Sequence, residues 1–212
     1  MIFGCDLDVV STAAVDGVRQ ATRYASHPMR VDAESEPLLT ERLRLRRSVP
    51  GDADAISAYR SDPEVNRTQG WERTDPESVR ADIEEMSARA PGEPGGWVQF
   101  SVEERDGGGL VGDVGISPAD GESGVIKVGY TMSPAFQGRG YATEAVAALV
   151  AYAFEALGAD VVRAYADADN TASIRVAEKV GMRLMERFEH REGDEIWFVV
   201  RYERRREDAP VA

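Results

Sequence analysis

The residues best suited to chemistry form a short turn, QGRGYA at residues 137–142, placed directly before an alanine-rich helical stretch. The first amide groups of a helix have no partner within the helix, and the helix dipole adds partial positive charge there. Gly138 and Gly140 let a ligand approach the backbone and permit positive φ angles, while Arg139 adds a cation. The turn can therefore cradle a phosphate or pyrophosphate, although a tight strand-to-helix turn would use the same glycines.

Two other phosphate-binding motifs fit this turn poorly. No Gly-Lys-Ser/Thr follows at the spacing of a P-loop. A dinucleotide fingerprint would need a third glycine where Thr143 stands, and its first glycine would follow the strand without the intervening residues 133–137. A dinucleotide-dependent oxidoreductase is therefore only a minor alternative.

The hydrophobic pattern predicts the elements that must position this turn. Leu43 and Leu45 alternate with arginines as in a strand, and Asp75 and Asn170 are suited to cap helices. Three strand-like runs separated by glycine-rich turns indicate an antiparallel meander. We expect helices over about 52–60, 75–89, 140–157 and 170–181, and strands over about 43–47, 97–105, 107–117, 123–133, 161–166 and 194–204.

This order of elements predicts an α+β fold with a mixed, mostly antiparallel sheet of about six to seven strands and helices on both faces. Strands 125–132 and 161–166 are joined by a single helix, which indicates a parallel pair. We divide the chain into an N-terminal extension (1–37, with an amphipathic helix expected near 9–25), a main domain (38–206) and a tail (207–212).

The composition excludes several classes of function. A formal net charge of −13 over 212 residues argues against nucleic acid as a partner and suits a cationic one, such as an amine. Cys5 is the single cysteine, and with only His27 and His190 beside it the sequence predicts no metal site. No apolar run approaches the roughly 20 residues of a membrane-spanning helix, so we expect a cytoplasmic protein without membrane contact.

Several motifs in the right order and spacing resemble the GCN5-related N-acetyltransferase (GNAT) superfamily. Its acetyl-CoA motif, Gln/Arg-x-x-Gly-x-Gly/Ala, matches residues 137–142, and GYATEA at 140–145 resembles the branch of ribosomal-protein N-terminal acetyltransferases. The stretch 167–182 is similar to a second signature of that branch. The resemblance spans about residues 38–204 and implies a splayed parallel pair in the centre of the sheet.

The resemblance also implies that acetyl-CoA is bound as a co-substrate, largely by main-chain groups. The pantetheine arm would pair with a strand, the pyrophosphate would rest on the turn, and the helix N-cap residue would add a contact. The residues implied for cofactor binding are Tyr130, Thr131, Met132, Gln137, Gly138, Arg139, Gly140, Tyr141, Ala142 and Asn170.

Acetyl transfer needs a neutral amine, stabilisation of the oxyanion and a proton for the leaving thiolate. A strand amide near Thr131 or Met132 is our candidate oxyanion donor. In many members of the superfamily a tyrosine on the later helix supplies the proton, but Ala177 stands at that position. Ser173 lies one turn earlier on the same helix face, and the resemblance to the ribosomal branch implies that a serine at this place contacts the CoA sulfur. We predict that Ser173 is the catalytic residue, with assistance to the helix cap as the alternative role.

The general base and the wall of the acceptor slot are left open. The resemblance implies an acidic residue where Lys127 stands, so the candidates that are left for the base are Glu103, Glu104, Asp113 and His190. Side chains alternate between the two faces of a strand, so in strand 97–105 Gln99 shares one face of the sheet with residues 97 and 101. Either face of this strand could line the slot that receives the amine.

The sequence predicts an N-acetyltransferase that moves an acetyl group from acetyl-CoA to a primary amine by direct attack. The acceptor could be a protein N-terminus, a lysine, a polyamine or an aminoglycoside-like molecule. The alternative is a CoA-binding sensor or interaction module without efficient catalysis, which the missing tyrosine and Lys127 favour. A homodimer is left open.

Overall fold

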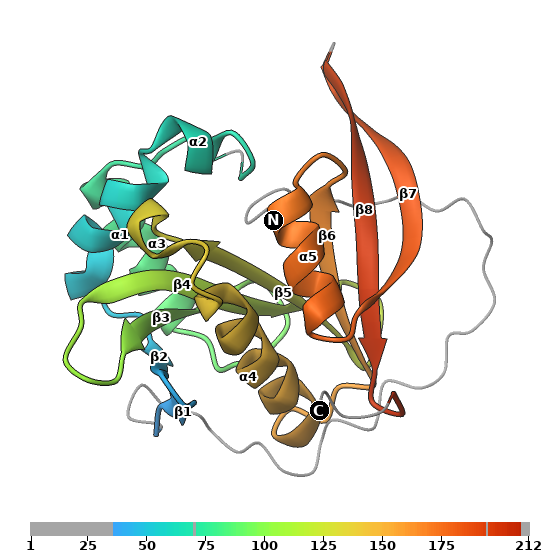
Figure 1. The fold of residues 1–212 in the computed structure, drawn as a ribbon, viewed down its shortest axis with the longest axis horizontal. Coiled ribbons are helices and arrows are strands. Elements are labelled where there is room, and N and C mark those ends of the chain that lie inside the picture. The colour runs from blue at the N-terminus through green and yellow to red at the C-terminus, as the bar shows by residue number, and fades with distance from the viewer. Residues whose placement is uncertain (1–35, 70, 194, 209–212) are drawn as a thin grey trace.

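The computed structural model describes residues 36–69, 71–193 and 195–208. The described residues form one eight-stranded sheet in the order β1-β2-β3-β4-β5-β6-β8-β7, in which only the β5–β6 pair is parallel (Figure 1). The predicted fold class is confirmed, with one or two strands more than expected. The strands are β1 (Leu38–Leu39), β2 (Leu43–Arg47), β3 (Val98–Glu104), β4 (Leu110–Pro118), β5 (Val125–Met132), β6 (Val161–Asp167), β7 (Arg183–Glu192) and β8 (Glu195–Arg205).

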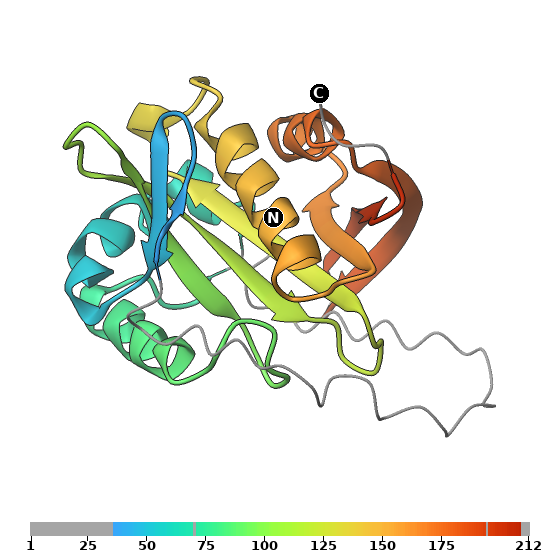
Figure 2. The ribbon, with the colours of Figure 1, turned by 90° about the horizontal axis from the view of Figure 1, so that it is seen from below.

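The helices cover both faces of the sheet, as predicted (Figure 2). Helices α1 to α3 lie on one face, where α1 contacts β4 and α3 contacts β3. Helices α4 and α5 lie on the other, where α4 contacts β5 and α5 contacts β6. The helices are α1 (Ala53–Arg60), α2 (Pro63–Asn66), α3 (Pro76–Ser87), α4 (Tyr141–Glu155) and α5 (Thr171–Lys179).

Local signals for the helix starts are confirmed. The side chain of Asp75 accepts a hydrogen bond from the N–H of Ser78 at 3.0 Å, so it caps α3, and Pro76 occupies the first helical position. Val79 and Ile83, one turn apart, are fully buried against α1. The amphipathic helix expected near 9–25 lies outside the described residues, as does most of the tail.

Strand β7 was not predicted. It pairs with β8 along a hairpin that forms one edge of the sheet and extends past α5 (Figure 1). Most of its side chains are exposed and charged, so the strand lacks the alternation of apolar and polar residues that a half-buried strand shows.

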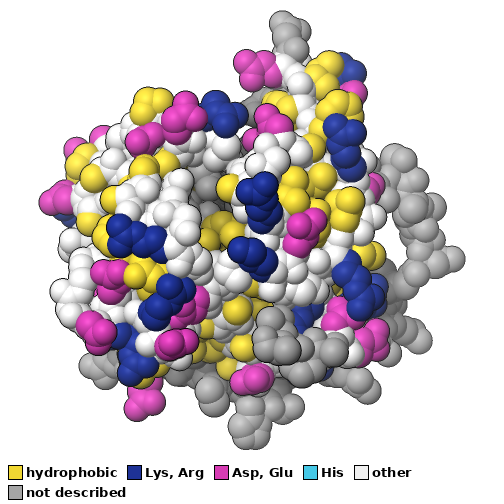
Figure 3. Space-filling model, in the orientation of Figure 1, with side chains coloured by type: hydrophobic (Ala, Val, Ile, Leu, Met, Phe, Trp, Pro, Cys, Tyr) yellow, Lys and Arg dark blue, Asp and Glu magenta, His cyan; other side chains and the backbone are white. Residues whose placement is uncertain are grey.

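The parallel pair stays together over only three residues. Val125–Lys127 of β5 pairs with Val161–Arg163 of β6, and the rest of β6 pairs with β8 alone. Within the described residues no strand lies in the gap that opens between them. On the face of the molecule seen in Figure 3, the surface is hollowed between the half that carries α2 and the half that carries α5.

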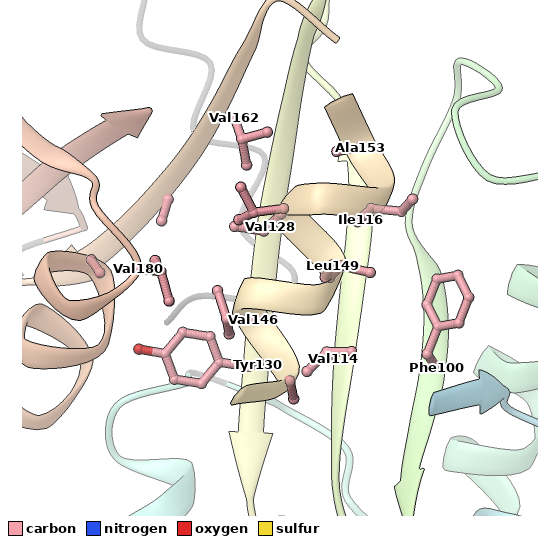
Figure 4. Close-up of a cluster of buried hydrophobic side chains, with 14 of the residues drawn as sticks. Phe100, Val114, Ile116, Val128, Tyr130, Val146, Leu149, Ala153, Val162 and Val180 are labelled. Carbon is pink, nitrogen blue, oxygen red and sulfur yellow. The ribbon is translucent and has the colours of Figure 1, made fainter. Parts of the chain in front are cut away.

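The main core lies between α4 and the centre of the sheet. Val146, Leu149 and Ala153 of α4 are buried and point toward Val114 and Val128 of β4 and β5 (Figure 4). Small alanines elsewhere along α4 allow the helix to lie close to the strands. This packing fixes the position of the N-terminus of α4 relative to the end of β5.

Replacing Gly112 by alanine should destabilise the domain. A Cβ at this position would lie 2.3 Å from the carbonyl oxygen of Thr131 and 2.9 Å from the Cα of Met132. These backbone atoms belong to the β4–β5 pairing, and overpacking of this kind costs about 1–3 kcal/mol. Urea unfolding measures the difference. The matched control is Gly109→Ala, where a Cβ meets nothing within 4 Å, and equal midpoints for Gly112→Ala and wild type would contradict the prediction.

Candidate functional site

The turn before α4 leaves a set of main-chain donors unpaired. Gly138 and Gly140 have φ angles of 74° and 82°, so both adopt the left-handed conformation that the sequence indicated. No side chain caps α4. Within the described residues, nothing accepts a hydrogen bond from the N–H groups of residues 138–143. Free amides at a helix N-terminus can bind an anion.

A glutamate in the first turn of α4 is held away from these donors. The carboxylate of Glu144 accepts hydrogen bonds from the hydroxyl of Thr40 (2.5 Å) and from the amide and Nε of Arg42 (2.8 and 2.6 Å). Arg42 also donates to the carbonyl of Arg139 at 3.0 Å. Burial would raise the pKa of Glu144, but these donors together hold it below its usual value. The carboxylate is thus satisfied by the loop between β1 and β2, which also braces the turn.

Alternation along β5 decides which main-chain groups face the gap. The N–H of Ser133 donates to the carbonyl of Val111, and the carbonyl of Val125 accepts from the N–H of Ala119. Both ends of the strand therefore turn the main-chain groups of odd-numbered residues toward β4. The even-numbered residues turn theirs toward β6 and, beyond the last strand pair, toward the gap.

Tyr130 and Met132 are thus the residues that present main-chain groups to the gap. Their carbonyl oxygens accept hydrogen bonds from the side-chain amides of Gln69 (3.4 Å) and Gln137 (3.1 Å). Thr131 lies between them with its main-chain groups toward β4. Of the three strand residues expected to pair with a cofactor, Tyr130 and Met132 turn their main-chain groups toward the gap. Of the two residues named for the oxyanion donor, only Met132 has this orientation, and Tyr130 is an additional candidate.

Ser173 lies close to β5, in the first turn of α5. Its N–H is bound by the side chain of Asn170 at 3.1 Å, which confirms the predicted helix cap. Its carbonyl oxygen accepts a hydrogen bond from the hydroxyl of Tyr130 at 3.0 Å. The side chain is buried, and in the described part of the chain its hydroxyl has no partner. Ala177, one turn further on, is buried as well, so it leaves an apolar surface where the superfamily often has a tyrosine.

The opposite face of the sheet carries a row of polar side chains. Ser101, Asp113 and Thr131 are direct cross-strand neighbours on β3, β4 and β5, so they share one face. All three are buried. The apolar set of β3, including Phe100, faces α4 instead, so Gln99 and Ser101 lie on the side of α1.

Asp113 is fully buried and held by α1. The hydroxyl of Tyr59 donates to one of its oxygens, and the guanidinium of Arg60 lies 3.5 Å from the other. Arg60 also donates to Oε1 of Gln99 at 3.2 Å and lies over the ring of Trp71 at 4.4 Å. Burial raises the pKa of Asp113, against the effect of the nearby guanidinium. Sequence reasoning missed Arg60, because a basic residue at a helix C-terminus is usually solvated.

The structure places the candidates for the general base in different surroundings. Glu103 is paired with two arginines of β2 at 2.6 and 3.4 Å. Glu104 accepts a hydrogen bond from a tyrosine in α4, and Asp113 is held by α1. The ring of His190 lies 4.6 Å from that of a tryptophan in β8. Lys127 lies 3.9 Å from Asp120. The three carboxylates are therefore bound to other groups rather than free at the edge of β5.

Two further properties concern the described residues only. They contain no group of three or more His, Cys, Asp or Glu side chains placed to hold a metal ion. None of their helices is both long enough and apolar enough to cross a membrane.

Comparisons with known proteins agree with this geometry. The family model of the GNAT acetyltransferase domain matches residues 42–183. The N-acetyltransferase p20 of Bacillus licheniformis is 31% identical over 148 residues, which cover 70% of this chain and 83% of the relative. The crystal structure of a GNAT-family acetyltransferase from Bacillus anthracis superposes with a TM-score of 0.73 at 27% identity, covering 81% of this chain and 99% of that chain.

The fold also matches RimJ of Mycobacterium smegmatis, solved in complex with CoA-disulfide, with a TM-score of 0.69 at 23% identity over 79% of this chain and 84% of that chain. A parted parallel pair beside an uncapped helix N-terminus, together with these matches, defines an acyl-CoA-dependent N-acyltransferase. The chain belongs to the GNAT acetyltransferase domain family.

Replacing Glu144 by glutamine should lower stability at neutral pH by about 1–2 kcal/mol, because hydrogen bonds to a charged group are lost at a partly exposed site. The folded-state pKa of Glu144 is lowered. Its contribution is therefore present above the ordinary carboxyl pKa and disappears as pH falls through the lowered value.

Urea unfolding at about pH 7 and at several acidic pH values tests this expectation. The difference between wild type and Glu144→Gln should shrink as the pH falls. The control is Glu155→Gln, an exposed position at the other end of α4. A difference that does not depend on pH would contradict the prediction.

Proposed function

We propose that this enzyme transfers an acetyl group from acetyl-CoA to a primary amine by direct attack. The observation that carries this proposal is the edge of β5, where the main-chain groups of Tyr130 and Met132 face a gap between the turn before α4 and Ser173. This edge can pair with an extended pantetheine arm as a further strand would.

The residues present fit the anionic part of the cofactor. The unpaired N–H groups of residues 138–143 can hold a pyrophosphate, and the strand exposes an edge for the pantetheine. The backbone N–H of Gln137 is bound to Pro134 at 3.3 Å, so this residue contributes through its side chain, which braces Met132. An acidic protein with net charge −13 thus offers local donors to an anion.

Each step of transfer has a candidate group. The N–H of Tyr130 or Met132 stabilises the oxyanion that forms when a neutral amine attacks the thioester. The hydroxyl of Ser173 donates a proton or hydrogen bond to the departing thiolate, as the neighbouring Ala177 cannot. The attacking amine loses one proton as the amide forms, and this proton returns to the Ser173 oxygen or leaves through water. The hollow between α2 and α5 offers the acceptor a route to the gap, and the excess of acidic residues attracts amines to the protein.

Replacing Gly140 by valine should weaken CoA binding about tenfold or more. The residue has a φ of 82°, a conformation that costs a β-branched residue about 1–3 kcal/mol. Relaxation of this strain would displace the amides of the turn. Calorimetric titration with CoA measures the affinity. The control is Gly158→Val, because Gly158 has a φ of 72° and lies beyond the far end of α4. An unchanged CoA affinity in Gly140→Val would contradict the proposal that this turn binds the pyrophosphate.

Replacing Ser173 by alanine should lower kcat by about tenfold or more, while CoA affinity stays close to that of wild type. The hydroxyl is proposed to act on the leaving thiolate, so its loss affects turnover rather than cofactor binding. Thiol release and calorimetry measure the two quantities. The control is Thr171→Ala, an exposed position in the same helical turn. An unaltered kcat in Ser173→Ala would exclude the acid role.

A further inference from the structure

Four buried polar atoms, carried by α1, by the segment after α2 and by β3 and β5, have no hydrogen-bond partner in the described structure. Their residues are at most 5% exposed. A buried polar atom without a partner costs about 1–3 kcal/mol, so such atoms are rare unless a ligand or ordered water binds them. The four atoms are Arg60 Nε, Gln69 Oε1, Gln99 Nε2 and Thr131 Oγ1.

In each glutamine, the side-chain amide atom that is hydrogen-bonded fixes the orientation of the amide and so identifies the atom without a partner. Gln69 donates through Nε2 to the carbonyl of Tyr130, so its Oε1 is the unpaired acceptor. Gln99 accepts through Oε1 from Arg60, so its Nε2 is the unpaired donor. The cluster therefore offers both an acceptor and a donor, with the hydroxyl of Thr131 able to act as either.

The cluster adjoins the edge of β5 where transfer is proposed. Gln69 binds Tyr130, whose main-chain groups face the gap, and Thr131 follows in the chain. Thr131 is the cross-strand neighbour of Asp113, which contacts Arg60, which in turn binds Gln99. These contacts connect the residues at the gap with those packed beneath α1.

The charge of this cluster does not favour a second cation. Arg60 is the only charged residue among the four, and the carboxyl groups of Asp113 and Asp82 act on its guanidinium. Both carboxyl oxygens of Asp113 are already in contact with α1. The four residues themselves therefore present hydrogen-bonding groups and no negatively charged side chain.

We infer that this cluster (Arg60, Gln69, Gln99, Thr131) is an acceptor subsite for an uncharged group that both donates and accepts hydrogen bonds, such as an amide, carried by the amine substrate. The inference rests on the proposed function. A diamine or polyamine would bring a second positive charge to the guanidinium of Arg60 and leave the amide groups of the glutamines unsatisfied. The enzyme should therefore prefer amines with an uncharged amide over diamines.

The first test uses the wild-type protein and three small acceptors of similar length: β-alaninamide, 1,3-diaminopropane and n-butylamine. Thiol release at saturating acetyl-CoA gives kcat/KM, which is expressed per neutral amine because the three amines differ in pKa. We expect β-alaninamide, or its homologue one methylene longer, to exceed both other amines by about tenfold or more.

Two variants of Gln99 test the assignment in opposite directions. Gln99→Met removes the unpaired donor and should reduce the preference for the amide to near unity. Gln99→Glu places a carboxylate at the same point and should shift the preference toward the diamine. Gln69→Met serves as a second deletion should Gln99→Met fail to fold. The control is Tyr152→Phe, which removes an unpaired buried hydroxyl from α4, on the opposite face of the sheet, and should leave the ratio unchanged.

The outcomes separate this inference from the proposed function. Equal kcat/KM for the three amines would overturn the subsite and leave the acetyltransferase proposal standing. A preference that survives in Gln99→Met, Gln99→Glu and Gln69→Met would show that the cluster holds only water, which also overturns it. CoA binding without acetylation of any amine would overturn both.

Discussion

The early parting of β5 and β6 is the constraint on which the site depends. Main-chain N–H and C=O groups need partners, and a strand in the middle of a sheet normally finds them on both sides. Beyond Lys127 the edge of β5 has lost its neighbour, and side chains of Gln69 and Gln137 reach the carbonyls there instead. The fold thereby keeps one strand edge open in the centre of the sheet rather than only at its periphery.

The two sides of the β5 edge differ in their electrostatics. On the proposed cofactor side, unpaired amides can attract an anion, and the carboxylate of Glu144 is bound by Thr40 and Arg42 instead of competing for them. On the proposed acceptor side, Asp113 and Arg60 are buried together beneath α1. A strongly acidic chain can therefore offer donors to an anion at one point and uncharged polar groups at another.

Sequence patterns predicted the parts of this architecture that depend on local chemistry. The caps Asp75 and Asn170, the glycine turn and the parallel pair around one helix all follow from short-range signals. Strand β7 was not predicted because an exposed edge strand does not need alternating apolar and polar residues. The contact between Arg60 and Gln99 was not predicted either, because it joins residues 39 positions apart. It depends on a strand register that no local pattern specifies.

The bond between Arg42 and Glu144 has a consequence for folding. The two residues are 102 positions apart in the chain, and closing so long a loop costs conformational entropy before any contact stabilises it. The first strands of the domain must therefore remain available until α4 has been synthesised and docked. The contact that braces the turn before α4 is among the long-range contacts of the fold, and contacts of this kind slow folding.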